Sequence, residues 1–184
     1  MPLLLRSASE SDVPLIQDLA RRIWHRCYAD LLPVEQRDYM LAWMYAAHKL
    51  ESEIRRGVDY RIAGVEGAPA GYLAWELLAG GETAHLHKLY LIPEWHGHGF
   101  GQAMLQHVMN AAVLRGARTL ELRVNRGNAR ALRAYRRAGF EPAGERVTDI
   151  GAGFVMDDFI LRRALRVMEP GFDCQSGTGD PRSG

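Results

Sequence analysis

The stretch from Thr83 to Gln102 constrains this chain more than any other, because a strand pattern runs directly into a glycine-rich loop and then a helix. Residues 83–91 (TAHLHKLYL) alternate two sets of side chains, which is typical of a strand. One face is predicted to carry Ala84, Leu86, Lys88 and Tyr90, and the other His85, His87, Leu89 and Leu91. Pro93 lacks a backbone donor and should end the strand pairing.

The loop after this strand reads HGHGFG, residues 96–101, and an amphipathic helical pattern follows it. Glycines at alternate positions let a backbone approach a bulky anion closely, and free N–H groups at a helix N-terminus suit a pyrophosphate. The loop does not fit the dinucleotide fingerprint, because position 102 is Gln. It is not a Walker loop either, because no Gly-Lys-Ser/Thr follows.

Length and composition indicate one ordinary globular domain. Of 184 residues, 47% are hydrophobic, which excludes a disordered chain, and residues 1–166 are predicted to form the domain. Residues 167–184 are too poor in apolar side chains to build a core and are expected to form a disordered tail. The net charge of +1 gives no reason to expect nucleic acid or an acidic membrane as a partner. No apolar run approaches the ~20 residues of a membrane span, and the N-terminus does not read as a secretory signal. Cys27 and Cys174 read as free thiols of a cytoplasmic protein.

Periodicity along the chain predicts an α/β (α+β) domain with a mixed, mostly antiparallel central sheet and helices on both faces. Helices are expected from about Ser11 to Cys27, from Pro33 to about Gly57, over 102–115 and over 129–138. Strands are expected at 3–6, 60–65, 70–77, 83–91, 119–124, 140–147 and 154–161, with a flexible connection over 149–153.

A second motif follows the strand at 119–124 and reads Asn125-x-x-Asn128-x-x-Ala131-x-x-x-Tyr135-x-x-x-Gly139-Phe140. Asn128 is placed to cap the next helix, and Tyr135 lies two turns later, so both can share a face. The alternative interpretation is that Tyr135 is a core aromatic with a satisfied hydroxyl.

The glycine loop resembles motif A of the GNAT superfamily of N-acetyltransferases, Arg/Gln-x-x-Gly-x-Gly/Ala, with His96, Gly99 and Gly101 in those places. His96 departs from the usual Arg or Gln. The second motif resembles the GNAT motif after the fifth strand, and the likeness covers about residues 3–165. The first fifty residues are similar to bacterial small-molecule and polyamine acetyltransferases, and HLHKLYL is similar to a strand of aralkylamine N-acetyltransferases.

This resemblance implies transfer of an acetyl group from acetyl-CoA to a primary amine of a small molecule by direct attack, with Tyr135 as the general acid for the departing thiolate. It also implies the cofactor contacts. The pantetheine arm is expected along Leu89, Tyr90 and Leu91, the pyrophosphate on residues Gly97, His98, Gly99, Phe100, Gly101 and Gln102, a cofactor carbonyl on Asn128, and the 3′-phosphate on Arg137.

The acceptor amine must lose a proton before it attacks, and His87, with His85 on the same strand face, is the first candidate base. Glu121 on the neighbouring strand is the second. These histidines have a plainly structural alternative, as buried or surface side chains. A zinc or copper site on the His85/His87 and His96/His98 pairs is a further alternative, but no familiar set of ligands completes it, and no metal is expected.

Four aromatics of the early helices, Trp24, Tyr28, Tyr39 and Trp43, are candidates for an apolar wall of the acceptor pocket, or else they are core residues. Rival hypotheses are a peptide N-terminus or a lysine as the acceptor, and a catalytically silent acyl-CoA-binding sensor. The family's habit suggests a homodimer.

Overall fold

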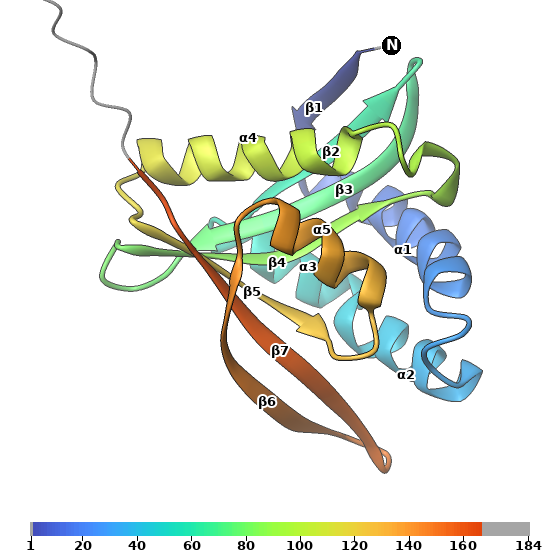
Figure 1. Ribbon diagram of the computed structural model, residues 1–184. Helices are drawn as coiled ribbons and strands as arrows, with labels where there is room; N and C mark the ends of the chain where they lie inside the picture. The colour runs from blue at the N-terminus through green and yellow to red at the C-terminus, as the bar shows by residue number, and fades with distance from the viewer. Residues whose placement is uncertain (1, 167–184) are drawn as a thin grey trace, which may run out of the picture.

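The computed structural model describes residues 2–166, and the predicted tail at 167–184 lies outside this described part. Seven strands form one sheet in the order β1-β2-β3-β4-β5-β7-β6 (Figure 1). They are β1 (Leu3–Ser7), β2 (Asp59–Val65), β3 (Ala68–Leu77), β4 (Thr83–Leu91), β5 (Thr119–Asn125), β6 (Glu141–Gly151) and β7 (Phe154–Ala164). Neighbouring strands are antiparallel except β4 and β5, which run parallel. The predicted mixed, mostly antiparallel sheet is confirmed.

Helices cover both faces of the sheet, as predicted. The five α-helices are α1 (Val13–Cys27), α2 (Val34–Met44), α3 (Ala47–Arg55), α4 (Phe100–Leu114) and α5 (Ala129–Arg137). The apolar residues of α4 and α5 join one hydrophobic core, and those of α1, α2 and α3 join a second core on the opposite face. Parallel strands need a crossover, and α4 supplies it between β4 and β5. No helix within residues 2–166 is long and apolar enough to cross a bilayer.

The predicted single helix from Pro33 to Gly57 is wrong, because it divides into α2 and α3 at Tyr45 and Ala46. Ala46 is extended, with ψ at 135°. Gln17 of α1 donates its side-chain amide to the carbonyl oxygen of Tyr45 at 2.7 Å, and the buried Tyr45 hydroxyl accepts from Tyr72 at 2.7 Å. These tertiary contacts offset the lost helical hydrogen bonds, and a local sequence pattern carries no sign of them.

The last two strands form a long hairpin that extends past the other strands (Figure 1). The predicted flexible connection over 149–153 is instead mostly strand, and β6 continues to Gly151. Ala152 and Gly153 make the tight turn, both with positive φ (53° and 78°). This geometry matches the twist of paired strands.

Candidate active site

A cavity of about 840 Å³ opens where β4 and β5 separate. The two strands pair only from Thr83↔Thr119 to Leu86↔Leu122. From His87 onward, β4 has no strand partner on its β5 side, while its pairing with β3 continues to Leu91. A free strand edge of this kind can receive an extended, amide-bearing ligand as if it were a further strand.

A bulge in β4 sets which side chains face the cavity. Ala74 of β3 lies opposite Lys88, and Trp75 lies opposite Leu86, so His87 is an extra residue without a β3 partner. One extra residue reverses the alternation of faces. Beyond the bulge, residues Leu89 and Leu91 therefore join Ala84 and Leu86 in the core beneath α4, while Tyr90 packs with the α1–α3 core. Lys88 also faces that side, with Nζ 5.7 Å from the centroid of the Tyr45 ring. The predicted strict alternation of β4 is wrong after residue 87.

The glycine loop lies at one end of the cavity, and Gly97, Gly99 and Gly101 line it. Gly99 is the N-cap of α4 in the left-handed conformation, with φ at 82°. The first N–H groups of α4 have no partner inside the helix, and the N–H groups of residues 97–99 donate to no backbone carbonyl within the described chain. A methyl group added to Gly97 or Gly99 would meet no atom within 4 Å, so the space in front of the loop is open. The loop therefore fits an anionic group.

The other side chains of the loop point in different directions. His98 and Phe100 point into a separate hollow against β1, so only their backbone can serve the cavity. Gln102 lines the cavity and donates to the carbonyl oxygen of Ala134 in α5 at 3.1 Å. His96 lines the cavity too, and its Nε2 lies 2.9 Å from the carbonyl oxygen of Leu91. A carbonyl oxygen only accepts, so His96 donates, and its ring ties the loop to the end of β4.

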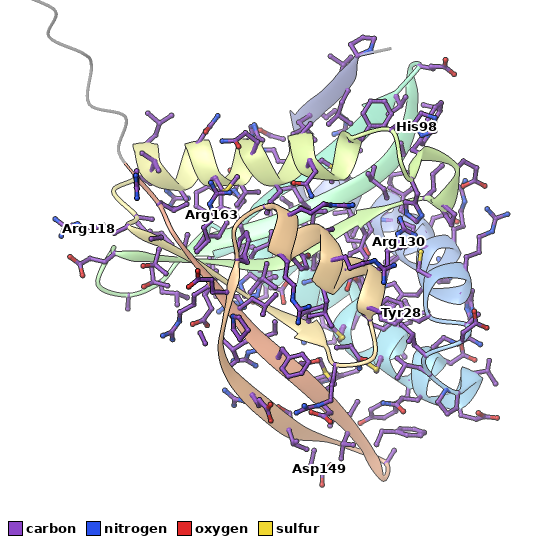
Figure 2. All side chains as sticks on the ribbon, in the orientation of Figure 1. Tyr28, His98, Arg118, Arg130, Asp149 and Arg163 are labelled. Atoms are coloured by element: carbon purple, nitrogen blue, oxygen red, sulfur yellow. The ribbon has the colours of Figure 1, made fainter. Side chains whose placement is uncertain are left out.

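Helix α5 brings the second motif to the cavity. The side chain of Asn128 accepts from the N–H of Ala131 at 3.0 Å, which makes it the helix cap that the motif predicts. Tyr135 and Arg137 both line the cavity. Burial, and then the neighbouring Tyr28, raise the pKa of Tyr135, so its hydroxyl is protonated at neutral pH. Figure 2 labels Tyr28 and Arg130 near the start of α5, with His98 above them in the view, beside the loop before α4.

The paired histidines of β4 lie in one cluster with carboxylates from the strands on either side. The rings of His85 and His87 are 4.7 Å apart, and both residues line the cavity. Nε2 of His87 lies 2.7 Å from Oε1 of Glu76 in β3. Nδ1 of His85 lies 3.4 Å from Oε1 of Glu121 in β5. Glu121 does not line the cavity and accepts from Arg162 at 2.7 Å, so it supports His85 rather than standing free as a base.

Burial decides the charge of both histidines. Burial and then the neighbouring His87 lower the pKa of His85 to about 4. Burial also lowers the pKa of His87, although the carboxylate of Glu76 opposes this shift. Both imidazoles are therefore neutral at pH 7 and able to accept a proton.

Of the four predicted wall aromatics, the structure brings two to the cavity. Trp24 and Tyr28 line it, and their rings stack with centroids 4.6 Å apart. Tyr39 lies elsewhere, where its hydroxyl donates to the carbonyl oxygen of Ile150. Trp43 is 43% exposed and carries Lys49 over its ring, so it is a surface residue. Two aromatics of α2 that share a helical pattern with core residues thus face away from the site.

Several cavity residues escaped the sequence analysis. Apolar side chains from three segments form much of the cavity wall, namely Leu31, Leu32, Met40, Met44, Val155 and Met156. Asp158 of β7 and Lys88 of β4 also line the cavity, and both are buried. Lys88 forms an ion pair with Glu53 of α3 at 3.0 Å. An Asp or Lys within a strand pattern can indicate a buried charged group with a special role, but the neighbouring residues in the sequence do not show which cavity it faces.

The described residues contain no group of three or more His, Cys, Asp or Glu side chains arranged to hold a metal ion.

Comparison with known sequences places these features in a family. Residues 18–140 match the model of the acetyltransferase (GNAT) family. An uncharacterized N-acetyltransferase of Mycobacterium tuberculosis is 39% identical over 80 residues, which are 44% of this chain and 51% of that protein. The chain thus spans about half the length of the first curated relatives that it matches. Spermidine N(1)-acetyltransferase of Thermoplasma acidophilum is 26% identical over 162 residues, covering 85% of this chain and 97% of that protein.

Solved structures share the fold. The PaiA N-acetyltransferase of Thermoplasma acidophilum in complex with coenzyme A superposes with a TM-score of 0.74 at 24% identity, covering 89% of this chain and 99% of that chain. A ribosomal-protein-alanine N-acetyltransferase from Brucella melitensis has a TM-score of 0.62 at 23% identity, covering 88% of this chain and 99% of that one.

Proposed function

The chain belongs to the acetyltransferase (GNAT) family, and on that premise we propose that it transfers the acetyl group of acetyl-CoA to the primary amine of a small molecule. The observation that carries this proposal is the gap between β4 and β5. It opens one cavity that is lined both by the open glycine loop and by two neutral histidines.

The donor fits this gap from end to end. The free N–H groups of the loop and of the first turn of α4 suit the pyrophosphate, and the free edge of β4 suits the amides of the pantetheine arm. Arg130, Arg133 and Arg137 of α5 line the same side and carry positive charge toward the phosphates. His96 replaces the usual Arg or Gln of the motif, and it supports the loop through Leu91 rather than by a permanent charge.

Bound acetyl-CoA supplies a thioester, whose carbonyl carbon forms a bond to the amine nitrogen while its carbon–sulfur bond breaks. His87 takes the proton that the ammonium must lose before attack, and Glu76, bonded to the same ring, stabilises the imidazolium that results. An N–H at the unpaired end of β4 polarises the thioester carbonyl as negative charge develops on its oxygen. Tyr135 gives a proton to the departing thiolate, the nitrogen's second proton replaces it after attack, and the proton held by His87 passes to solvent, so that a neutral amide, a neutral thiol and one released proton result.

Tyr135 is the group proposed to meet the departing sulfur. Its pKa is raised by burial, which widens the gap to the thiol. A phenol of this kind is best suited to donate a hydrogen bond to the sulfur during carbon–sulfur cleavage, with the proton passing as the thiolate forms. Its hydroxyl has no hydrogen-bond partner within the described residues, so it is available for this contact.

The apolar part of the cavity lining favours an acceptor with an apolar body. Met40, Met44 and Met156 lie there, and methionine side chains adapt to irregular apolar ligands. Trp24 and Tyr28 add a flat aromatic surface. We therefore expect alkyl or arylalkyl amines to be better acceptors than polar peptides.

The test is release of the CoA thiol from acetyl-CoA, measured with a panel of arylalkylamines, polyamines, amino acids and short peptides. Stimulation by one class of small amine, with the acetylated amine found by mass spectrometry, is the expected result. Stimulation by peptides alone would replace the small-molecule acceptor with a protein acceptor. Binding of acetyl-CoA without release by any amine would indicate a silent acyl-CoA sensor, and absence of binding would refute the proposal altogether.

A further inference from the structure

We propose that Asp158 binds the ammonium group of the acceptor and so restricts this site to amines that arrive as cations. The inference deepens the proposed function and rests on it. Asp158 belongs to β7, lines the cavity and is only 4% exposed. Asp158 belongs to neither of the two sequence motifs, so neither motif predicts this carboxylate.

The carboxylate of Asp158 has no bonded partner. Within residues 2–166, no side chain or backbone group donates a hydrogen bond to it, and it takes part in no ion pair. Two cations of this part of the sheet are engaged elsewhere, whereas Arg146 lies opposite Asp158 in the β6–β7 register and forms no ion pair with it within the described residues. Arg126 binds Asp157 at 3.0 Å and Glu145 at 2.8 Å, and Arg162 binds Glu121 at 2.7 Å. Arg123 of β5 lies on the same sheet face and its charge acts on Asp158, as does the charge of the adjacent Asp157. A buried carboxylate without a bonded partner carries a desolvation cost that a bound cation relieves.

Strand register places Asp158 beside the reaction. Asp158 pairs with Asn125, at the end of β5 that borders the gap. On the same sheet face, β5 carries Arg123 and Glu121. Glu121 lies opposite His85 of the neighbouring strand β4. The hydroxyl of Tyr28 lies 3.5 Å from that of Tyr90 in β4, and the field of Asp158 acts on Tyr28. Asp158 thus faces the region between the histidines and the gap, where the amine must lie to attack the thioester.

Burial raises the pKa of Asp158, whereas Arg123 opposes that shift. An arriving ammonium would, like Arg123, favour the ionised form of Asp158, because an opposite charge at short range stabilises a carboxylate. The role is one of binding and orientation, since His87 remains the group that takes the proton. A neutral amine would gain nothing from this contact, which gives the proposal a distinctive signature.

The experiment compares Asp158→Asn with Asp157→Asn, a matched control. Asp157 is the adjacent residue, its carboxylate binds Arg126, and it does not line the cavity. Steady-state rates are measured at pH 7 with 2-phenylethylamine, which is cationic, and with aniline, which is neutral. We expect Asp158→Asn to raise the KM for 2-phenylethylamine at least 10-fold, to change its kcat less than 3-fold, and to leave the KM for aniline within 2-fold. Asp157→Asn should change neither KM by more than 2-fold.

A binding measurement separates this inference from the proposed function. Calorimetry on the CoA-bound wild-type protein should show 2-phenylethylammonium binding at least 10-fold more tightly than 2-phenylethanol, a neutral isostere. That comparison needs no variant and holds even if Asp158→Asn fails to fold. Equal affinities, or an unchanged KM in a folded Asp158→Asn that still binds acetyl-CoA, would overturn the inference. If no amine is acetylated but the ammonium still binds selectively, the proposed function fails and the cation site stands.

Discussion

At the residue scale, the proposed chemistry depends most on the hydroxyl group of Tyr135. Tyr135→Phe keeps the ring, whose centroid lies 5.7 Å from that of Phe140, and removes only the oxygen. We expect kcat to fall by about 100-fold, within the range for one acid–base group, while the Kd for acetyl-CoA stays within 2-fold. Stopped-assay rates and calorimetry measure the two quantities. Tyr72→Phe is the control, because Tyr72 is a buried tyrosine outside the cavity. An equal loss of kcat in both variants would contradict the role.

The histidine cluster predicts a specific pH dependence. Burial lowers the pKa of His87 below its ordinary value, so the base is lost, and kcat/KM falls, only as the pH drops below about 6.5. Glu76 raises that pKa, so Glu76→Gln should move the acid limb to still lower pH and reduce kcat/KM at pH 7 several-fold, because the histidine becomes a weaker base. Rates between pH 5 and 8 test this. His48→Gln, at an exposed histidine of α3, should leave the profile unchanged. A limb that shifts upward in Glu76→Gln would exclude His87 as the base.

Local patterns explain why some site residues were predictable and others were not. The spacing of glycines identified Gly97, Gly99 and Gly101, and the second motif identified Asn128 and Tyr135, because loop and helix-cap geometry is set by nearby residues. Asp158 and the methionines of the wall escaped, because they meet only through strand register and helix packing. Tyr39 and Trp43 were predicted in the pocket and lie outside it, since an aromatic pattern does not show which neighbour a helix face meets.

At the element scale, the bulge of β4 and α3 are joined by a buried ion pair. Nζ of Lys88 lies 3.0 Å from Glu53, and the two side chains are 5% and 14% exposed. The hydroxyl of Tyr60 donates to the same carboxylate. Burial lowers the pKa of Lys88, against the pull of Glu53. The residue that follows the bulge is therefore fixed to the helix layer, which holds the neighbouring His87 in place.

Removing one member of this pair should be costly. Lys88→Met leaves Glu53 buried without its cation, so we expect the free energy of unfolding to fall by about 3 kcal/mol. The double variant Lys88→Met, Glu53→Gln should recover part of that loss, because the uncompensated charge is gone while Tyr60 keeps an acceptor. Arg118→Met is the control. It breaks an exposed pair with Glu82 at 3.9 Å and should change stability by no more than about 0.5 kcal/mol. Urea unfolding of the four proteins decides, and a Lys88→Met loss as small as the control's would refute a structural role for the pair.

The order and type of the elements were predictable from periodicity, and the layered α/β arrangement is confirmed. The break between α2 and α3 was not, because Gln17 of α1 and Tyr72 of β3 cause it from far along the chain. The length of β6 was missed for a similar reason. Its turn residue Ala152 adopts a positive φ that is unusual for alanine, and its partner strand imposes that conformation.

Across the whole molecule, donor binding should appear as added stability. Acetyl-CoA at a hundred times its Kd should raise the free energy of unfolding by about 2.7 kcal/mol, because it binds only the folded chain. Gly99 and Gly116 stand at opposite ends of α4 with φ of 82° and 91°, and both have open space for a methyl group. Alanine at either position should cost about 1–2 kcal/mol of backbone strain. Only Gly99→Ala should also lose the stabilisation by acetyl-CoA, as urea unfolding with and without ligand would show. Retained stabilisation in Gly99→Ala would place the donor elsewhere.

The extra residue in β4 shifts the phase of the side-chain alternation by one position for the rest of the strand. Before His87, every second residue serves the core beneath α4; after it, the same periodicity serves the opposite layer. Substitutions before His87 are therefore constrained by the histidine pair. Substitutions after it are constrained by the free strand edge and by Lys88. Deleting His87 would remove the bulge and its imidazole, yet Leu89 and Leu91 would stay beneath α4 and Lys88 and Tyr90 on the opposite layer, because the remaining residues would then alternate without interruption. Substitutions along β4 should accordingly be judged by their count from residue 87, not from the start of the strand.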